Sequence, residues 1–124
     1  MDSPEILRLE VSCDSSAPGV VRKAFDAVAP IGGVKDDARL VASELVTNAV
    51  VHSDCGSDDT IEVSARLSQD RLTIAVHDPG CSQRTPDSLR PDDDGMGLRI
   101  VGEIARRWGT ERPDGLLVWA ELEL

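Results

Sequence analysis

Aromatic residues are nearly absent from this chain. Its 124 residues include two Trp, one Phe and no Tyr. Single-strand nucleic-acid binding by base stacking needs several aromatic side chains, so the composition disfavours that class of function. A chain of this length forms one domain, here expected to span residues 1–124, and its core must be built from aliphatic side chains.

Positive charge is also scarce. Lys and Arg number 13 against 23 Asp and Glu, which gives a formal net charge of −10. Such an acidic surface repels both nucleic-acid phosphates and anionic membranes, so we expect neither as a partner. No apolar run reaches the ~20 residues of a membrane span, and the N-terminus does not resemble a signal peptide. The sequence therefore predicts a cytoplasmic protein.

Cysteine and histidine are too few for a disulfide framework or a His-rich metal site. The three cysteines are scattered at positions 13, 55 and 81, and the histidines stand at 52 and 77. An odd, dispersed set of this kind predicts reduced thiols that serve packing.

The pattern of apolar residues predicts eight elements. Helical periodicity occurs over about 18–29, 34–52 and 95–108, and strand-like alternation over 5–12, 61–67, 72–76, 109–113 and 116–124. Segment 81–94 has no period and is predicted to be a lid or binding loop. The order predicts an α+β fold, a two-layer sandwich in which three helices cover a mixed, mostly antiparallel sheet.

The helix predicted over 34–52 carries polar residues on its apolar side. Glu44, Asn48 and His52 lie within about 80° of one another around the helix axis, among apolar neighbours. Exposed polar residues are expected instead at Ser43 and Thr47. The buried stripe is either paired internally or lines a cavity in which its oxygen atoms hold a hard cation such as Mg²⁺.

Two further segments point to a ligand when they are taken with this stripe. Asp78-Pro79-Gly80 is either a simple turn or a carboxylate placed to accept a hydrogen bond from an amine such as that of adenine. The glycines of 94–98 either lead into a helix or let backbone N–H groups converge on a phosphate. Together the three segments predict a metal-assisted nucleotide site.

The order of these segments resembles the GHKL ATPase superfamily, most closely its small bacterial anti-sigma-factor serine kinases. Residues 44–52 are similar to the N box of that family, Asp78-Pro79-Gly80 to its first glycine box and 95–98 to its second. Residues 107–109 and 118–122 resemble the tail of the subfamily, so the likeness covers nearly the whole chain. The resemblance implies a Bergerat-type fold and a homodimer.

The resemblance also implies a role for each matching residue. Asn48 would bind the Mg²⁺ that bridges the ATP phosphates, and Glu44 would act as the catalytic base. Asp78 would bind the adenine amino group. The remaining contacts to ATP would come from the glycine boxes, at Gly80, Gly95, Gly97 and Leu98.

The function expected from this likeness is that of an ATP-binding transcription regulator. It would use Mg²⁺-ATP to phosphorylate a serine or threonine of an anti-anti-sigma (STAS-like) protein, and would also bind a sigma factor. The alternative is a non-catalytic partner-binding module with weak or no nucleotide binding. Two departures from the family pattern fall on adenine recognition or the lid hinge, and so bear on the affinity for ATP. They are Ser82, where the family usually has glycine, and Leu117, where it often has threonine.

Overall fold

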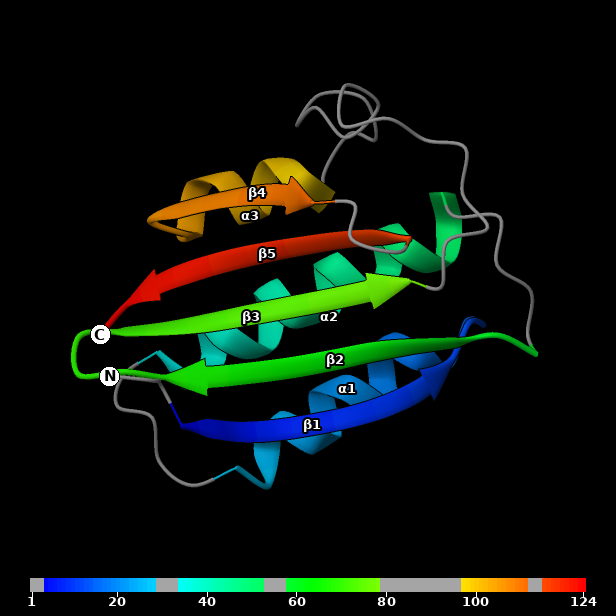
Figure 1. Cartoon of the computed structure of the whole chain (residues 1–124), viewed down its shortest axis with the longest axis horizontal. Coiled ribbons are helices and arrows are strands. Elements are labelled where there is room, and N and C mark those ends of the chain that lie inside the picture. The colour runs from blue at the N-terminus through cyan, green and yellow to red at the C-terminus, as the bar shows by residue number, and fades with distance from the viewer. Residues whose placement is uncertain (1–3, 29–33, 53–57, 79–96, 112–114) are drawn as a thin grey trace.

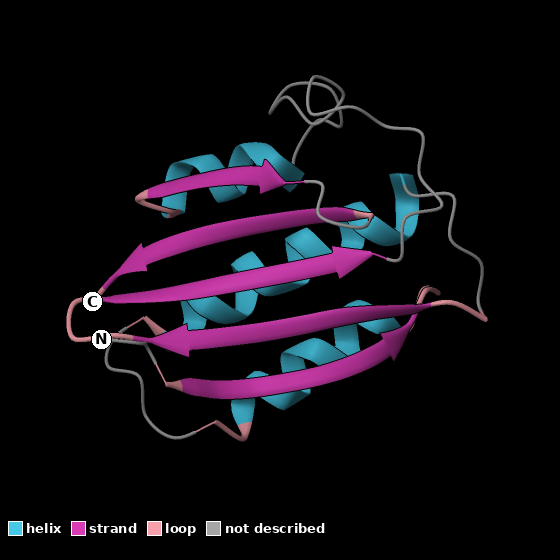
Figure 2. Cartoon of the chain, viewed as in Figure 1, coloured by secondary structure: helices cyan, strands magenta, loops and turns pink. Residues whose placement is uncertain are grey.

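The computed structural model describes residues 4–28, 34–52, 58–78, 97–111 and 115–124 (Figure 1). Figure 2 shows the same view with helices and strands in different colours. The elements in chain order are β1 (Glu5–Ser12), α1 (Ala17–Asp26), α2 (Lys35–His52), β2 (Thr60–Leu67), β3 (Arg71–Asp78), α3 (Gly97–Ile104), β4 (Arg107–Glu111) and β5 (Leu116–Glu123).

The five strands form one sheet in the order β1-β2-β3-β5-β4. Every pair of neighbouring strands within the described part of the chain is antiparallel. Two hairpins, β2–β3 and β4–β5, meet where β3 pairs with β5. The α+β class and the three helices predicted from the sequence are confirmed. The sheet was predicted to be mixed and mostly antiparallel, and its described strand pairs are all antiparallel.

The helices lie behind the sheet as Figure 1 presents it. α1 packs against β1 and α2, while α2 also packs against β3 and α3. Alternation along the strands directs one set of side chains toward the helices, and these are buried. This helix-facing side is aliphatic, with Ile61, Val63 and Ala65 on β2 and Leu72, Ile74 and Val76 on β3.

The single Phe of the chain belongs to the buried side of α1. Phe25 on α1 is fully buried, as are Ala17 and Val21 on the same side of that helix. Pro18 stands in the first turn, where its missing N–H removes no helical hydrogen bond. Ser16 occupies the N-cap position without a side-chain cap, because its hydroxyl hydrogen-bonds to Asp14 instead.

The third helix is shorter than the sequence pattern predicts. We expected it to continue to Trp108, but α3 ends at Ile104 and Trp108 belongs to β4. The backbone changes partner within one residue: the N–H of Ala105 still donates to Val101, whereas that of Arg106 donates to the carbonyl of Glu121 on β5. Pairing with β5 therefore overrides the local helical period.

The expectation of reduced thiols is wrong for Cys13, which is disulfide-bonded. Cys13 follows β1, is 6% exposed, and donates its backbone N–H to the carbonyl of Asp59. Its partner lies outside the described residues. The sequence spacing of cysteines does not determine their distance in space, which is why the pairing was missed.

In the described segments, no helix combines the length and the apolar character needed to cross a membrane.

Candidate functional site

The long helix α2 buries an amide side chain. Asn48 is 5% exposed, as its place in the apolar arc predicts, and Glu44, one turn earlier, is half-buried. The amide nitrogen Nδ2 of Asn48 is buried and has no hydrogen-bond partner among the described residues. Leaving a buried donor unpaired costs about 1–3 kcal/mol. An oxygen atom of a ligand would remove that penalty.

The opposite side of α2 differs from the sequence expectation. Ser43 was expected to be exposed, but it is 3% exposed, and Thr47 is half-buried. Their hydroxyls donate to carbonyls of their own helix, from Ser43 to Leu40 and from Thr47 to Ser43. Such local hydrogen bonds satisfy a hydroxyl without water, so these side chains tolerate burial.

Asp78 ends strand β3 in a buried position. It is 2% exposed and pairs with Leu116 on β5. The alternation of β3 places its side chain on the helix-facing side, together with Ile74 and Val76. Since α2 packs against β3, Asp78 and Asn48 both belong to the layer between helix and sheet.

Helix α3 begins at the second glycine of the glycine-rich segment. Gly97 is its first residue, and the helix packs against α2. Leu98 lies in its first turn. The backbone N–H groups at a helix start lack helical partners and favour an anion there. Gly80, Gly95 and the predicted lid lie outside the described residues, and so does the side chain of His52.

The residues present fit a metal-bound nucleotide. One amide offers an oxygen that can bind a cation and a nitrogen that can donate to a phosphate oxygen. Asn48, Asp78 and Gly97 come from three elements of which α2 contacts both others. A buried amide, a buried carboxylate and a helix start can thus serve cation, base and phosphate respectively.

The face of the sheet turned away from the helices carries features that the sequence analysis missed. A hollow of about 350 Å³ lies there, lined by side chains of β2, β3, β4 and β5 that include Thr73, Leu117 and Trp119. Leu117 pairs with His77 and so lies on the opposite face from Asp78. The expectation that Leu117 bears on adenine recognition is therefore not supported by the strand register.

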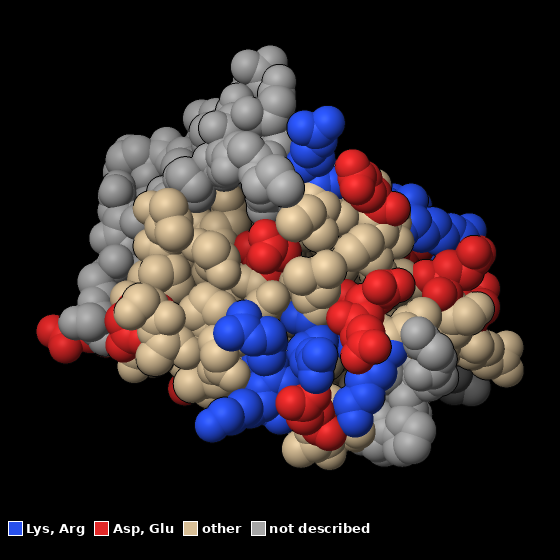
Figure 3. All heavy atoms as spheres, turned by 180° about the vertical axis from the view of Figure 1, so that it is seen from behind, with Lys and Arg blue, Asp and Glu red and all other residues tan. Residues whose placement is uncertain are grey.

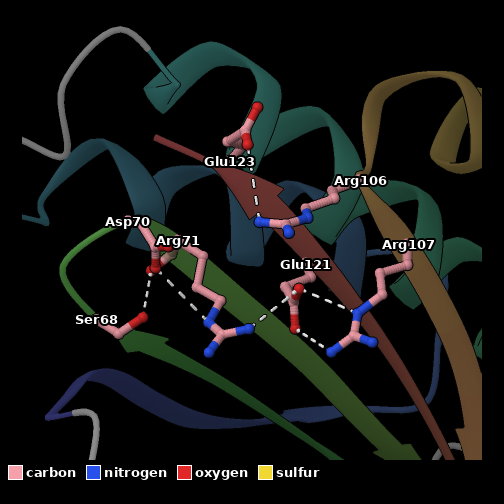
Figure 4. A network of polar contacts seen from close by, with 7 residues as sticks. All are labelled: Ser68, Asp70, Arg71, Arg106, Arg107, Glu121 and Glu123. Atoms are coloured by element: carbon pink, nitrogen blue, oxygen red, sulfur yellow. Dashed lines mark hydrogen bonds and ion pairs between the residues drawn. The ribbon is translucent and has the colours of Figure 1, made fainter.

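A buried glutamate joins two arginines on this open face (Figure 4). The guanidinium of Arg107 donates to both carboxylate oxygens of Glu121, at 3.1 and 3.2 Å. Arg71 lies 3.5 Å from the same carboxylate. The hydrogen bonds from Arg107, with a smaller contribution from Arg71, lower the pKa of Glu121. The same pairing raises the pKa of Arg107.

The indole ring of Trp119 on β5 lies against Gly109 of the neighbouring strand β4. A Cβ atom added to Gly109 would come within 2.8 Å of Cζ2 of Trp119. The guanidinium carbon of Arg107 lies 5.8 Å from the centroid of the indole, within the range of a cation–π contact. The alternation of apolar and acidic residues over 120–123 is the local sequence signal for this face.

Residues 15–121 match the family described as the histidine kinase-like ATPase domain. A search of curated proteins found no match.

Proposed function

The chain belongs to the histidine kinase-like ATPase domain family, and on that premise we propose that it is a Mg²⁺-ATP-dependent regulatory protein. In this proposal it is a cytoplasmic homodimer that phosphorylates a serine or threonine of a small STAS-like anti-anti-sigma protein. Its second partner is a sigma factor. Family membership supports ATP binding, and the resemblance of residues 44–52, 78–80 and 95–98 to the anti-sigma kinases supports the finer activity.

The observation that carries the proposal is the amide nitrogen Nδ2 of Asn48, which is buried and has no hydrogen-bond partner among the described residues. A buried donor without a partner among the described residues destabilises the free protein, yet α2 keeps it at 5% exposure. Binding of a phosphate oxygen would satisfy Nδ2, and the oxygen Oδ1 of the same amide could hold Mg²⁺. When bound, Mg²⁺ would neutralise the negative charge that develops on the phosphates.

The other residues would position the two ends of ATP. The carboxylate of Asp78 would accept a hydrogen bond from the adenine amino group, with Gly80 beside the ring. The backbone at Gly95, Gly97 and Leu98 would donate to the phosphates at the start of α3. Because guanine presents a carbonyl where adenine has its amino group, this arrangement favours ATP over GTP.

Glu44 would act on the protein substrate. It stands one helical turn before Asn48, so its carboxylate can lie beside the same phosphates. There it would orient the hydroxyl of the substrate serine and accept its proton as the serine oxygen bonds to the terminal phosphorus, while the bond from that phosphorus to the bridging oxygen breaks and ADP leaves.

Thermal unfolding with and without Mg²⁺-ATP tests the site. At a hundredfold excess over Kd, a ligand of the folded state adds about 2.7 kcal/mol, which raises Tm by several degrees. Asn48→Leu should abolish this rise while the Tm of the free protein stays equal or increases, because the unpaired donor is gone. Thr47→Ala, on the same helix, is the matched control and should keep the rise.

Phosphoryl transfer is tested separately, with labelled ATP and small partner proteins encoded nearby. Glu44→Gln should keep the Mg²⁺-ATP rise in Tm and lose transfer by about 10²-fold or more. Transfer at the wild-type rate would disprove the role of Glu44. A wild-type protein whose Tm does not respond to Mg²⁺-ATP would instead support the alternative, a partner-binding module that does not use nucleotide.

A further inference from the structure

One end of the sheet brings together the elements that carry the candidate site. β1 and β3 end there and β2 begins there, because both strand pairs are antiparallel. Figure 1 places the end of α2 and the start of α3 at the same end. Asp78 is the last residue of β3, Asn48 lies about one turn before the end of α2, and Gly97 begins α3. The turn that follows β1 therefore lies at the same end of the molecule as the candidate site.

Cys13 stands in this turn and is held by its surroundings. It directly follows β1, is 6% exposed, and donates its backbone N–H to the carbonyl of Asp59, just before β2, at 3.0 Å. The next residue, Asp14, accepts hydrogen bonds from the backbone N–H groups of Ser16, at 2.9 Å, and of Ala17, at 3.1 Å. The turn is thus fixed to β2 and to the start of α1, so it can anchor a crosslink.

The sequence limits the disulfide partner of Cys13 to two positions. The chain has three cysteines, so the bond joins Cys13 to Cys55 or to Cys81 and leaves the third cysteine as a thiol. Both lie outside the described residues, but Cys55 follows the end of α2 by three positions and Cys81 follows Asp78 by three. Either bond therefore ties the turn after β1 to the end of an element that carries a predicted ligand contact.

A disulfide is unusual in the cytoplasmic protein that we propose. Cellular reductants keep cytosolic thiols reduced, and the disulfides that do form there are usually catalytic or redox-sensing. The three cysteines stand far apart in the sequence and form no CxxC motif of the kind that catalyses thiol exchange. A sensing role is the one that fits, in which the bond opens and closes while the chain stays folded.

We propose that the disulfide of Cys13 is a redox switch of the nucleotide site, an inference that rests on the proposed function. The closed bond restrains the end of α2 or of β3, and so holds Asn48 or Asp78 in position for Mg²⁺-ATP. The open form lacks this restraint and binds the nucleotide more weakly. The reason is that a site already held in place loses less conformational entropy when the ligand binds.

The chemical step is thiol–disulfide exchange with a dithiol reductant. One thiolate of the reductant attacks a sulfur of the protein disulfide, which breaks the S–S bond of the protein and forms a mixed disulfide. The second thiol of the reductant then displaces the remaining protein sulfur. The reductant has given two electrons and two protons and ends as a disulfide, while both protein sulfurs end as thiols. An oxidised dithiol reverses the exchange.

The effect on the site comes from restraint and not from charge. Neither a disulfide nor a protonated thiol carries a charge. Acidic and basic side chains are already intermixed over the described part of the helix side (Figure 3). Opening the bond therefore leaves the charge pattern around the site as it is, and the loss of the crosslink is what changes the affinity.

Opening of the bond in the folded protein is tested first. The oxidised chain is treated with dithiothreitol without denaturant, its thiols are counted by alkylation and mass spectrometry, and far-UV circular dichroism reports the fold. We expect the count to rise from one thiol to three with the helix and strand signal retained. A bond that opens only in unfolding concentrations of urea would overturn the switch, because it would then be a structural crosslink.

The Kd of Mg²⁺-ATP is then measured by titration calorimetry for the oxidised and the reduced wild type. Reduction should weaken binding by at least about tenfold. Both forms are measured well below their Tm, so the loss of a stabilising crosslink does not by itself change the result. Tighter binding after reduction would overturn the proposal, because the closed bond would then not hold the site in its binding arrangement.

Serine variants supply the matched controls. Cys13→Ser should bind Mg²⁺-ATP as the reduced wild type does and should not respond to dithiothreitol. Of Cys55→Ser and Cys81→Ser, the variant that removes the partner should behave like Cys13→Ser, and the other should behave like the wild type. This pattern identifies the partner and shows that loss of a cysteine alone has no effect. A wild-type response to dithiothreitol in Cys13→Ser would overturn the switch.

Failure of the switch is distinguishable from failure of the proposed function. An equal Kd in the oxidised and reduced wild type would overturn the switch and leave ATP binding intact. No binding of Mg²⁺-ATP by either form would reject the nucleotide function, and the switch with it.

Discussion

The two faces of the sheet are built from the same strands but differ in burial and in the side chains that they carry. The side chains that face the helices are aliphatic and buried, as at Ile61, Ile74 and Leu122. The side chains between them along each strand form the open face, with arginines, glutamates and Trp119. Burial of apolar surface on the first face supplies most of the stability, whereas the second face contributes weaker, charge-dependent contacts suited to recognition.

The largest expected effect is on the helix-facing side. Phe25→Ala should lower the free energy of unfolding by about 3–5 kcal/mol, because it removes a fully buried ring from the only aromatic position in that helix. Urea denaturation measures the change. Val20→Ala, on the same helix but 45% exposed, should cost well under about 1 kcal/mol. Equal costs for the two variants would contradict the assignment of Phe25 to the core that the helix-facing side of the sheet shares with α1.

A smaller effect is expected where Trp119 crosses β4 on the open face. Gly109→Ala places a methyl group 2.8 Å from the indole, and we expect a loss of about 1–3 kcal/mol in stability, measured by urea denaturation. Combining it with Trp119→Ala should relieve the clash, so the two effects will not add. Gly102→Ala is the control, because its added Cβ lies at an ordinary 3.5 Å from Trp108 and a helix favours alanine.

Much of this division was predictable from local pattern. Alternation located β1 at Glu5–Ser12, and periodicity located α2 with Asn48 on its buried side. The predictions that failed concerned contacts between residues that are distant in the sequence. The end of α3 is set by a hydrogen bond from Arg106 to Glu121, and the pairing of Cys13 by its position in space. Neither feature can be predicted from a short stretch of the sequence.

The candidate site shows the same limit. Its residue types were readable, because an amide and a carboxylate on an apolar arc have few uses apart from binding or internal pairing. Their roles in ATP binding and transfer stay predictions. Which side chains meet on the open face was not readable, because it requires the register of the strand pairings. Only the register shows that Arg107 on β4 lies beside Glu121 on β5.

The smallest expected effect sharpens the comparison through pH. Hydrogen bonds from Arg107 lower the folded-state pKa of Glu121, so its contribution is present above the unfolded-state pKa and is lost as pH falls through the folded-state value. Glu121→Gln should therefore cost about 1 kcal/mol at neutral pH and progressively less in acid. Thermal unfolding at a series of pH values measures the difference. Glu123→Gln, whose carboxylate is 70% exposed and 3.7 Å from Arg106, should show almost no difference at any pH. If both variants behaved alike, the buried carboxylate would not be what distinguishes this part of the open face from ordinary surface.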